Sequence, residues 1–211
     1  MRLNYIPRLT YPNFDTYGAL YNWYAIQNAA NITASGWHVP TVAEFATLRT
    51  YIGSNGGKLK TTGTTYWNSP NTGATDELGF HARGTGYRDS DGSFIQLKVS
   101  SYLRASNNVL GVDSASLDNG SSGFNQGVVT DNQGHCIRLM KDSTSLTHGQ
   151  TGTYTGNDGK TYSTICIGTQ EWMSENLKET LYRDTSIIPI VTDNTAWAAL
   201  TTGARCSYNN A

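Results

Sequence analysis

Three aromatic and glycine-rich blocks between residues 17 and 80 constrain the fold more than any other part of the chain. They are YGALYNWYA from residue 17, GWHVPTVAEFATL from residue 36 and GGKLKTTGTTYWNSPNTGATDELGF from residue 56. Large aromatic side chains need a packed interior, and neighbouring glycines permit tight turns. The blocks therefore predict a compact domain that buries most of the five tryptophans. These are Trp23, Trp37, Trp67, Trp172 and Trp197.

One helix is predicted by its start signal and its periodicity. Thr41 precedes Glu44 by three residues, the spacing of a capping box that satisfies two backbone donors at a helix start. Apolar residues then recur at helical spacing up to Ile52, and Gly53 follows as a stop. We expect a helix over 41–52. Two weaker patterns suggest helices at 171–178 and at 195–202, the latter capped by Asn194 or Thr195.

Short alternating apolar runs elsewhere predict strands. The runs are GSFIQLKV (92–99), YLRAS (102–106), GHCIRLM (134–140) and KTYSTICIG (160–168). Asn157-Asp158-Gly159 between Tyr154 and Tyr162 predicts a hairpin, because both turn positions tolerate positive φ.

Composition bounds the class. Of the 211 residues only 15% are charged, and Gly, Ser, Thr, Asn and Tyr are abundant, which indicates a loop-rich α+β domain. A net charge of −1 without a basic stripe argues against nucleic acid as a partner. No apolar run approaches the ~20 residues of a membrane span, and no apolar signal core follows Met1. We expect neither membrane insertion nor an export signal in the sequence.

The three blocks resemble the Fibrobacter succinogenes major paralogous domain, a family related to the C-type-lectin-like fold. The resemblance resumes in DGKTYSTICIGTQEWMSENLKET from residue 158 and VTDNTAWAALTTGARCSYNN from residue 191. In that family the second stretch normally precedes YGALYNWYA, so the chain resembles a circularly permuted, phage-type copy. Permutation preserves a fold when the original ends are close. Tyr17 and Tyr208 should then lie within roughly 10 Å, about two strand spacings.

The resemblance divides the chain into an arm and one domain. Residues 1–16 match nothing that the resemblance covers, and we interpret them as an attachment arm for other virion proteins; the alternative is a strand that covers the domain's own core. Residues 17–211 form a single permuted C-type-lectin-like domain. Its Ser-, Thr- and Gly-rich joint lies near 143–159.

The segment 81–135 matches the family least, and in lectin-like architecture late strands and long loops form the variable ligand face. Its aromatic, arginine and amide side chains suit recognition. The candidate ligand-binding residues are Tyr87, Arg88, Tyr102, Arg104, Asn107, Asn108, Asp113 and Asn125. The alternative is that the polar residues form turns and the tyrosines are half-buried in strands.

The sequence gives little support for a catalytic or metal-binding site. GWHVPTVAEF is similar to a stretch of formylglycine-generating enzymes, but those oxidases need a closely spaced cysteine pair, and Cys136 and Cys206 are far apart. The resemblance leaves open whether these two pair; Cys166 is expected to be a buried free thiol. Asp89-Ser90-Asp91-Gly92 lacks the later glutamate of a calcium loop and is interpreted as a turn. We expect no enzyme activity, no cofactor and no metal.

The sequence thus predicts a non-enzymatic binding module, a phage virion protein for recognition of a host-surface glycan or protein. It would be made in the host cytoplasm and exposed on the virion, and it could form a homo-oligomer. A bacterial cell-surface or secreted protein that has lost its signal is the alternative location. A structural decoration or fibre protein is the alternative function, and an oxidase related to formylglycine-generating enzymes is a weaker one.

Overall fold

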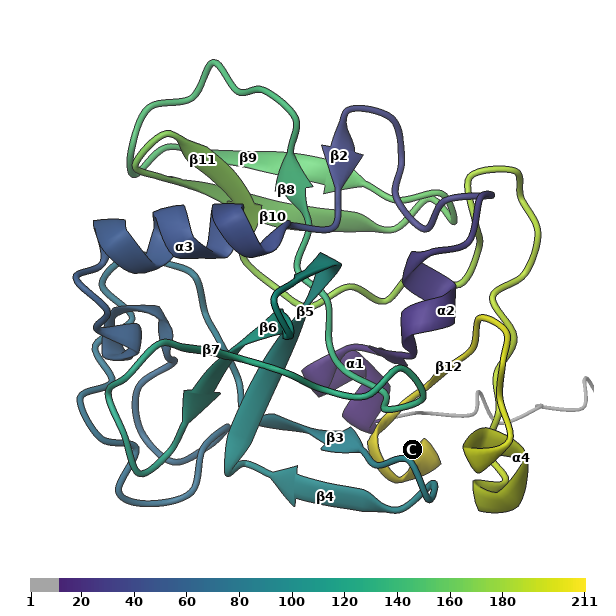
Figure 1. The fold of residues 1–211 in the computed structure, drawn as a ribbon. Helices are drawn as coiled ribbons and strands as arrows, with labels where there is room; N and C mark the ends of the chain where they lie inside the picture. The colour runs from purple at the N-terminus through teal and green to yellow at the C-terminus, as the bar shows by residue number, and fades with distance from the viewer. Residues whose placement is uncertain (1–11) are drawn as a thin grey trace, which may run out of the picture.

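The computed structural model describes residues 12–211 as a mixed α+β structure with two five-stranded sheets. In Figure 1 helix α3 (Val42–Tyr51) lies between them, below the sheet that contains β9 to β11 and above β5 and β6. Long irregular connections join the elements. The predicted loop-rich α+β class is confirmed.

The first sheet has the strand order β2-β8-β11-β10-β9, and all its neighbours are antiparallel. Its strands are β2 (Trp37–His38), β8 (Met140–Lys141), β9 (Thr151–Thr155), β10 (Thr161–Ile167) and β11 (Gln170–Met173). Tyr154 on β9 pairs with Tyr162 on β10 across the Asn-Asp-Gly turn. The predicted hairpin is therefore confirmed.

The second sheet has the order β4-β3-β5-β6-β7. Its strands are β3 (Thr85–Arg88), β4 (Phe94–Leu97), β5 (Ser100–Val109), β6 (Val112–Asp118) and β7 (Asn125–Gly127). β3 and β5 run parallel, with Gly86 opposite Ser101, and the other pairs are antiparallel. This parallel pair brings Tyr87 and Tyr102 next to each other.

Helix α3 begins at the predicted capping box. The Thr41 hydroxyl accepts from the Glu44 amide at 3.3 Å, and the Glu44 carboxylate accepts from the Thr41 amide at 2.7 Å. The Phe45 ring stacks on Trp172 of β11, with centroids 5.5 Å apart, and meets Phe124 at 6.3 Å. One helix side chain thus joins segments that belong to both sheets.

Three of the predicted elements differ in the structure. The helix expected at 171–178 is wrong, because Trp172 is in strand β11, paired with Ile165 and with Met140. The last predicted helix is shorter, α4 (Asn194–Ala198), and its cap is Asp193, whose Oδ1 accepts from the Ala196 amide at 2.8 Å. Of the run 134–140, only Met140 belongs to a strand.

The first and last described segments lie side by side. The Phe14 amide of α1 (Pro12–Tyr17) donates to the Ala211 carbonyl at 3.0 Å, and Asn13 Nδ2 donates to the Tyr208 carbonyl at 2.9 Å. The neighbouring short elements are β1 (Leu20–Tyr21), α2 (Trp23–Ile26), η1 (Gly56–Leu59), β12 (Arg205–Cys206) and η2 (Tyr208–Asn210). Adjacent ends are what a permutation requires; the permuted order itself stays a prediction.

Most of the predicted attachment arm, residues 1–11, lies outside the described residues. Residues 12–16 belong to α1 and pack on the domain itself. Among residues 12–211 no helix is both long and apolar enough to cross a bilayer.

Four tryptophans are buried, which confirms that prediction. Trp67, Trp172 and Trp197 are 0% exposed, Trp37 is 8% exposed, and Trp23 is only partly buried. Two clusters of buried side chains result, one around Trp172 and α3, the other around Tyr154 and Tyr162. The first cluster includes Leu103 of β5 and Leu117 of β6, so it packs the second sheet against α3.

Candidate binding surface

Three of the predicted ligand-binding residues are buried. Arg88 is 0% exposed, Arg104 1% and Asp113 2%. The expectation that their side chains form an exposed face is therefore wrong. The side chain of each forms hydrogen bonds inside the protein with partners that its local sequence does not indicate.

Arg88 connects distant parts of the chain. Its guanidinium donates to the carbonyls of Gly92, Val191, Thr192 and Asp193 and to the Asn194 side chain. The Cζ atom also lies 4.4 Å from the Trp197 ring centroid. Arg88 therefore holds the segment before α4 against the β3–β4 turn.

Arg104 and Asp113 form a buried ion pair, with Nη2 and Oδ2 3.3 Å apart. Arg104 also donates to the Thr130 carbonyl, and Asp113 accepts from the Val129 amide. Removing Arg104 would leave the buried Asp113 carboxylate without its cation, whereas Arg104 has a second carboxylate partner in Asp131, 3.3 Å away. Both residues thus stabilise the fold around β5 and β6.

The three predicted asparagines lie apart from one another. Asn107 Oδ1 accepts from the Val42 amide at the start of α3. Asn108 is exposed and closes the β5–β6 turn by accepting from the Gly111 amide. Asn125 is exposed on β7, opposite Ser116. The structure does not bring them into one site.

Tyr87 and Tyr102 are the predicted residues that the structure does bring together. Their ring centroids are 5.3 Å apart, with the rings nearly perpendicular, and both side chains are partly exposed. Neither hydroxyl forms a hydrogen bond with another residue in the part of the chain that the structure describes. We call these two rings the tyrosine pair.

His135 packs behind the tyrosine pair. Its imidazole centroid lies 5.3 Å from Tyr87 and 5.6 Å from Tyr102, and the residue is 1% exposed. Nε2 lies 3.4 Å from Gln133 Oε1, and Gln133 Nε2 donates to Asp89 at 2.9 Å. This places the proton on Nε2, whereas Nδ1 is buried without a partner.

Burial keeps the His135 imidazole and the Tyr87 phenol uncharged, although the Asp89 carboxylate lies nearby. Desolvation, with a smaller contribution from the Arg104 charge, lowers the pKa of His135 to about 3. Desolvation also raises the pKa of Tyr87, assisted by Asp89 and Tyr102. At pH 7 the imidazole is uncharged and the Tyr87 phenol keeps its proton. The pair can therefore offer ring faces and hydroxyl hydrogen bonds.

His135 and Trp23 are neighbours of this surface that the sequence did not predict. Trp23 of α2 lies against Arg104, with Cζ 4.6 Å from its ring centroid. The signal for His135 was present in the alternating run 134–140, but its contacts with β3 and β5 are long-range. Chain order alone does not predict them.

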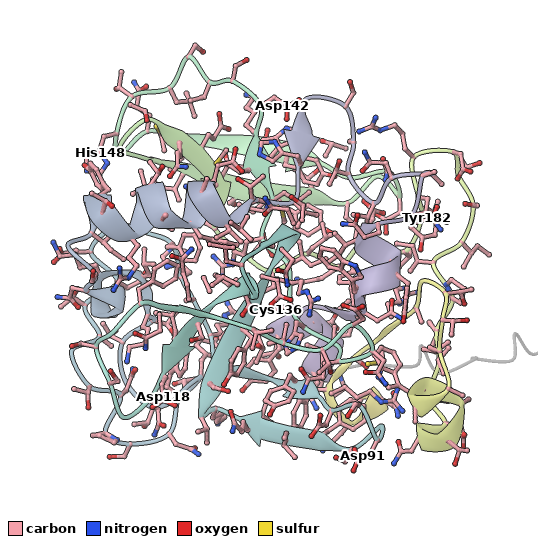
Figure 2. The ribbon with its side chains drawn as sticks, viewed as in Figure 1. Asp91, Asp118, Cys136, Asp142, His148 and Tyr182 are labelled. Atoms are coloured by element: carbon pink, nitrogen blue, oxygen red, sulfur yellow. The ribbon has the colours of Figure 1, made fainter. Side chains whose placement is uncertain are left out.

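The three cysteines and Asp91 are the other side chains that the sequence singled out for chemistry. Cys136, Cys166 and Cys206 are buried free thiols. Cys136, which lies inside the molecule (Figure 2), donates to the Tyr102 carbonyl at 3.2 Å. Figure 2 also shows Asp91 at the β3–β4 turn, where it accepts from the Ser93 amide at 2.8 Å. Within residues 12–211 no three His, Cys, Asp or Glu side chains are placed to hold a metal ion.

The fold defines a mixed α+β domain whose second sheet carries a partly exposed aromatic pair. The Fibrobacter succinogenes major domain matches residues 4–154, and the chain belongs to this family. The match begins at residue 4, so the expectation that residues 1–16 lie outside the family is wrong for 4–16. Residues 155–211 lie beyond the matched range. Neither a curated protein nor a solved structure matches the chain.

Proposed function

We propose that this protein is a non-enzymatic binding module that recognises a cell-surface glycan through Tyr87 and Tyr102. The observation that carries the proposal is the tyrosine pair with free hydroxyls on two neighbouring strands. Tyrosine supplies rigid contact area at low conformational-entropy cost, and its hydroxyl adds directional hydrogen bonds. A sugar offers both C–H faces and hydroxyl groups to such a pair.

The surroundings of the pair support recognition rather than chemistry. The imidazole behind the rings is neutral and buried, and its pKa of about 3 lies far from the range useful for general acid–base catalysis at pH 7. The neighbouring Arg104 and Asp113 neutralise each other inside the fold. Rigid backing of this kind reduces the ordering cost of binding. In the proposed setting the module is carried on a virion surface and contacts the host cell.

The test is a binding assay of the full chain on bacterial cells and on a glycan array. Tyr87→Ala and Tyr102→Ala are each expected to weaken binding about 5- to 150-fold, which corresponds to about 1–3 kcal/mol. Tyr51→Ala is the matched control, because Tyr51 is 48% exposed at the end of α3 and packs against His148 rather than against the tyrosine pair. Its binding should equal that of the parent.

Two outcomes would reject the proposal. One is glycan binding by Tyr87→Ala and Tyr102→Ala that equals that of the parent, when the melting temperatures of both variants also match the parent. The other is binding of the parent to a protein receptor with no glycan signal, which would reassign the ligand class. Tyr87→Phe and Tyr102→Phe separate ring stacking from hydroxyl hydrogen bonding, since they retain the rings.

A further inference from the structure

A second candidate site is a cavity of about 260 Å³ near the two described ends of the chain. Its walls come from α1, β12, η2 and the irregular segment around residues 180–192, all distinct from the strands that carry the tyrosine pair. The lining residues are Phe14, Thr180, Ile190, Thr192, Arg205, Cys206, Ser207 and Asn210. The volume is close to the lower end of small-ligand pockets.

Arg205 is the unusual wall residue. It is 8% exposed, and its Nε is buried without a hydrogen-bond partner among residues 12–211. No Asp or Glu among residues 12–211 forms a salt bridge with it. The guanidinium instead lies 5.9 Å from the Phe14 ring centroid. A buried charge normally has a partner, because burial without one is costly.

The position of Arg205 is fixed by its backbone. Its amide donates to the Pro189 carbonyl at 2.9 Å, and its carbonyl accepts from the Val191 amide at 3.2 Å. On the other side it pairs with Tyr21 of β1. The side chain is therefore presented to the cavity by a paired strand.

Asn210 supplies a second unpartnered polar atom beside the cavity. Its Oδ1 is buried without a partner among residues 12–211, whereas its Nδ2 donates to the Thr192 carbonyl. No acidic side chain lines the cavity among the residues that the structure describes. Residues 1–11, read as sequence, contain no Asp or Glu whose side chain could neutralise Arg205.

We propose that this cavity binds a small organic anion whose carboxylate pairs with the Arg205 guanidinium. The fork of N–H donors in arginine matches a carboxylate bidentately. Phe14 and Ile190 would contact the body of the ligand, and Asn210 Oδ1 would accept a hydrogen bond from one of its hydroxyl groups. A compact hydroxylated carboxylate, such as an acidic sugar unit or a small hydroxy acid, meets all three requirements.

The first test is calorimetric titration of the full chain with galacturonate, lactate, galactose and inorganic phosphate. At least one of the two carboxylates should bind, galactose should bind at least tenfold more weakly, and Arg205→Met should lose the carboxylate signal. Arg183→Met is the control, because Arg183 is an exposed arginine that bonds Thr33 elsewhere, and it should bind like the parent.

A second test does not require removal of the arginine. Thr192→Glu places a carboxylate on the cavity wall and should raise the melting temperature while abolishing carboxylate binding. Thr192→Gln, of similar size but uncharged, should keep the binding. The proposal is overturned if neither carboxylate binds the parent, if phosphate binds more tightly than both, or if Arg205→Met and Thr192→Glu both retain binding.

Discussion

Arg88 and Arg205 are both buried and both lie against the segment that precedes α4, but their surroundings are opposite. Arg88 donates to four backbone carbonyls and one side chain, among them the carbonyls of Val191 and Thr192. Arg205 lines a cavity beside Ile190 and Thr192 and has no acidic partner within residues 12–211. The first arrangement organises the fold, whereas the second leaves a cation available to a ligand.

Other buried polar groups also differ in whether their hydrogen-bonding atoms have partners. Arg138 donates to the Asn176 side chain and to the carbonyls of Phe80, His81 and Met173. Lys60 donates to three carbonyls, and His135 Nδ1 bonds nothing in the described chain. A buried polar group without a hydrogen-bond partner costs free energy. A buried group whose donors are all bonded therefore has a structural role, whereas one with an unbonded donor or acceptor is a candidate for ligand binding or for a pH-dependent role.

Arg88→Met should give the largest loss of stability. The change leaves several carbonyls that now accept from the guanidinium without a donor. We therefore expect a decrease of on the order of 3–5 kcal/mol in the free energy of unfolding. Urea denaturation monitored by tryptophan fluorescence measures this. A loss below about 1 kcal/mol would show that the bonds of Arg88 are dispensable and would break the comparison.

Lys60→Met should be the next most destabilising change. Lys60 Nζ lies 2.8–3.0 Å from the carbonyls of Thr72, Asp118 and Ser121, and the residue is 0% exposed. Methionine retains most of the packing but no donor, so the expected loss is about 2–4 kcal/mol. Lys98→Met, at a partly exposed lysine without such bonds, is the control and should stay near the parent in the same denaturation assay.

His135→Phe should change the pH dependence of stability. The folded pKa of about 3 lies below the unfolded value of about 6.5, so the unfolded chain takes up the extra proton between them. Stability contributed by the neutral imidazole is present above pH 6.5 and decreases as the pH falls toward 3, at up to about 1.4 kcal/mol per pH unit.

The phenylalanine variant should flatten the stability curve between pH 6.5 and 5, above the range in which most carboxylates titrate. Thermal melts across this window check the effect. His148→Phe, at an exposed histidine on another surface, is the matched control. A parent curve that is already flat, or equal slopes in the parent and His135→Phe, would contradict the prediction.

Arg205→Met should have the smallest effect on the ligand-free protein. No side-chain hydrogen bond is lost at Nε, and an unpaired buried charge is removed, so the free energy of unfolding should change by less than about 1 kcal/mol or rise. The same denaturation series as for Arg88→Met measures it. A loss comparable with that of Arg88→Met would make Arg205 structural and erase the difference between the two arginines.

Local signals predicted the elements that local interactions form. The Thr41 and Glu44 capping box gave α3, and Asn157 to Gly159 gave the β9–β10 hairpin. Trp172 shows the limit, because pairing with Met140 and Ile165 places it in a strand against its helical pattern. Tertiary contacts outweigh weak local propensity at such positions.

The candidate sites were less predictable for the same physical reason. Arg88 looked like a surface anchor because nothing near it in sequence shows that acceptors from residues 191–194 converge on it. Tyr87 and Tyr102 were named as candidates, but their contact depends on the parallel pairing of β3 with β5. No sequence pattern marks Arg205, because the lack of a carboxylate near it among residues 12–211 depends on which distant segments pack around it.

The hydrogen bonds between α1 and η2 have a consequence for how the domain can be used as a building block. A unit whose entry and exit meet can be inserted into a surface loop of another protein without stretching either side of the host chain. Such an insertion would leave the β5–β6 hairpin and the tyrosine pair unchanged in sequence. The domain can therefore be inserted between two fixed points of a host chain, with β3 and β5 displayed by the inserted body.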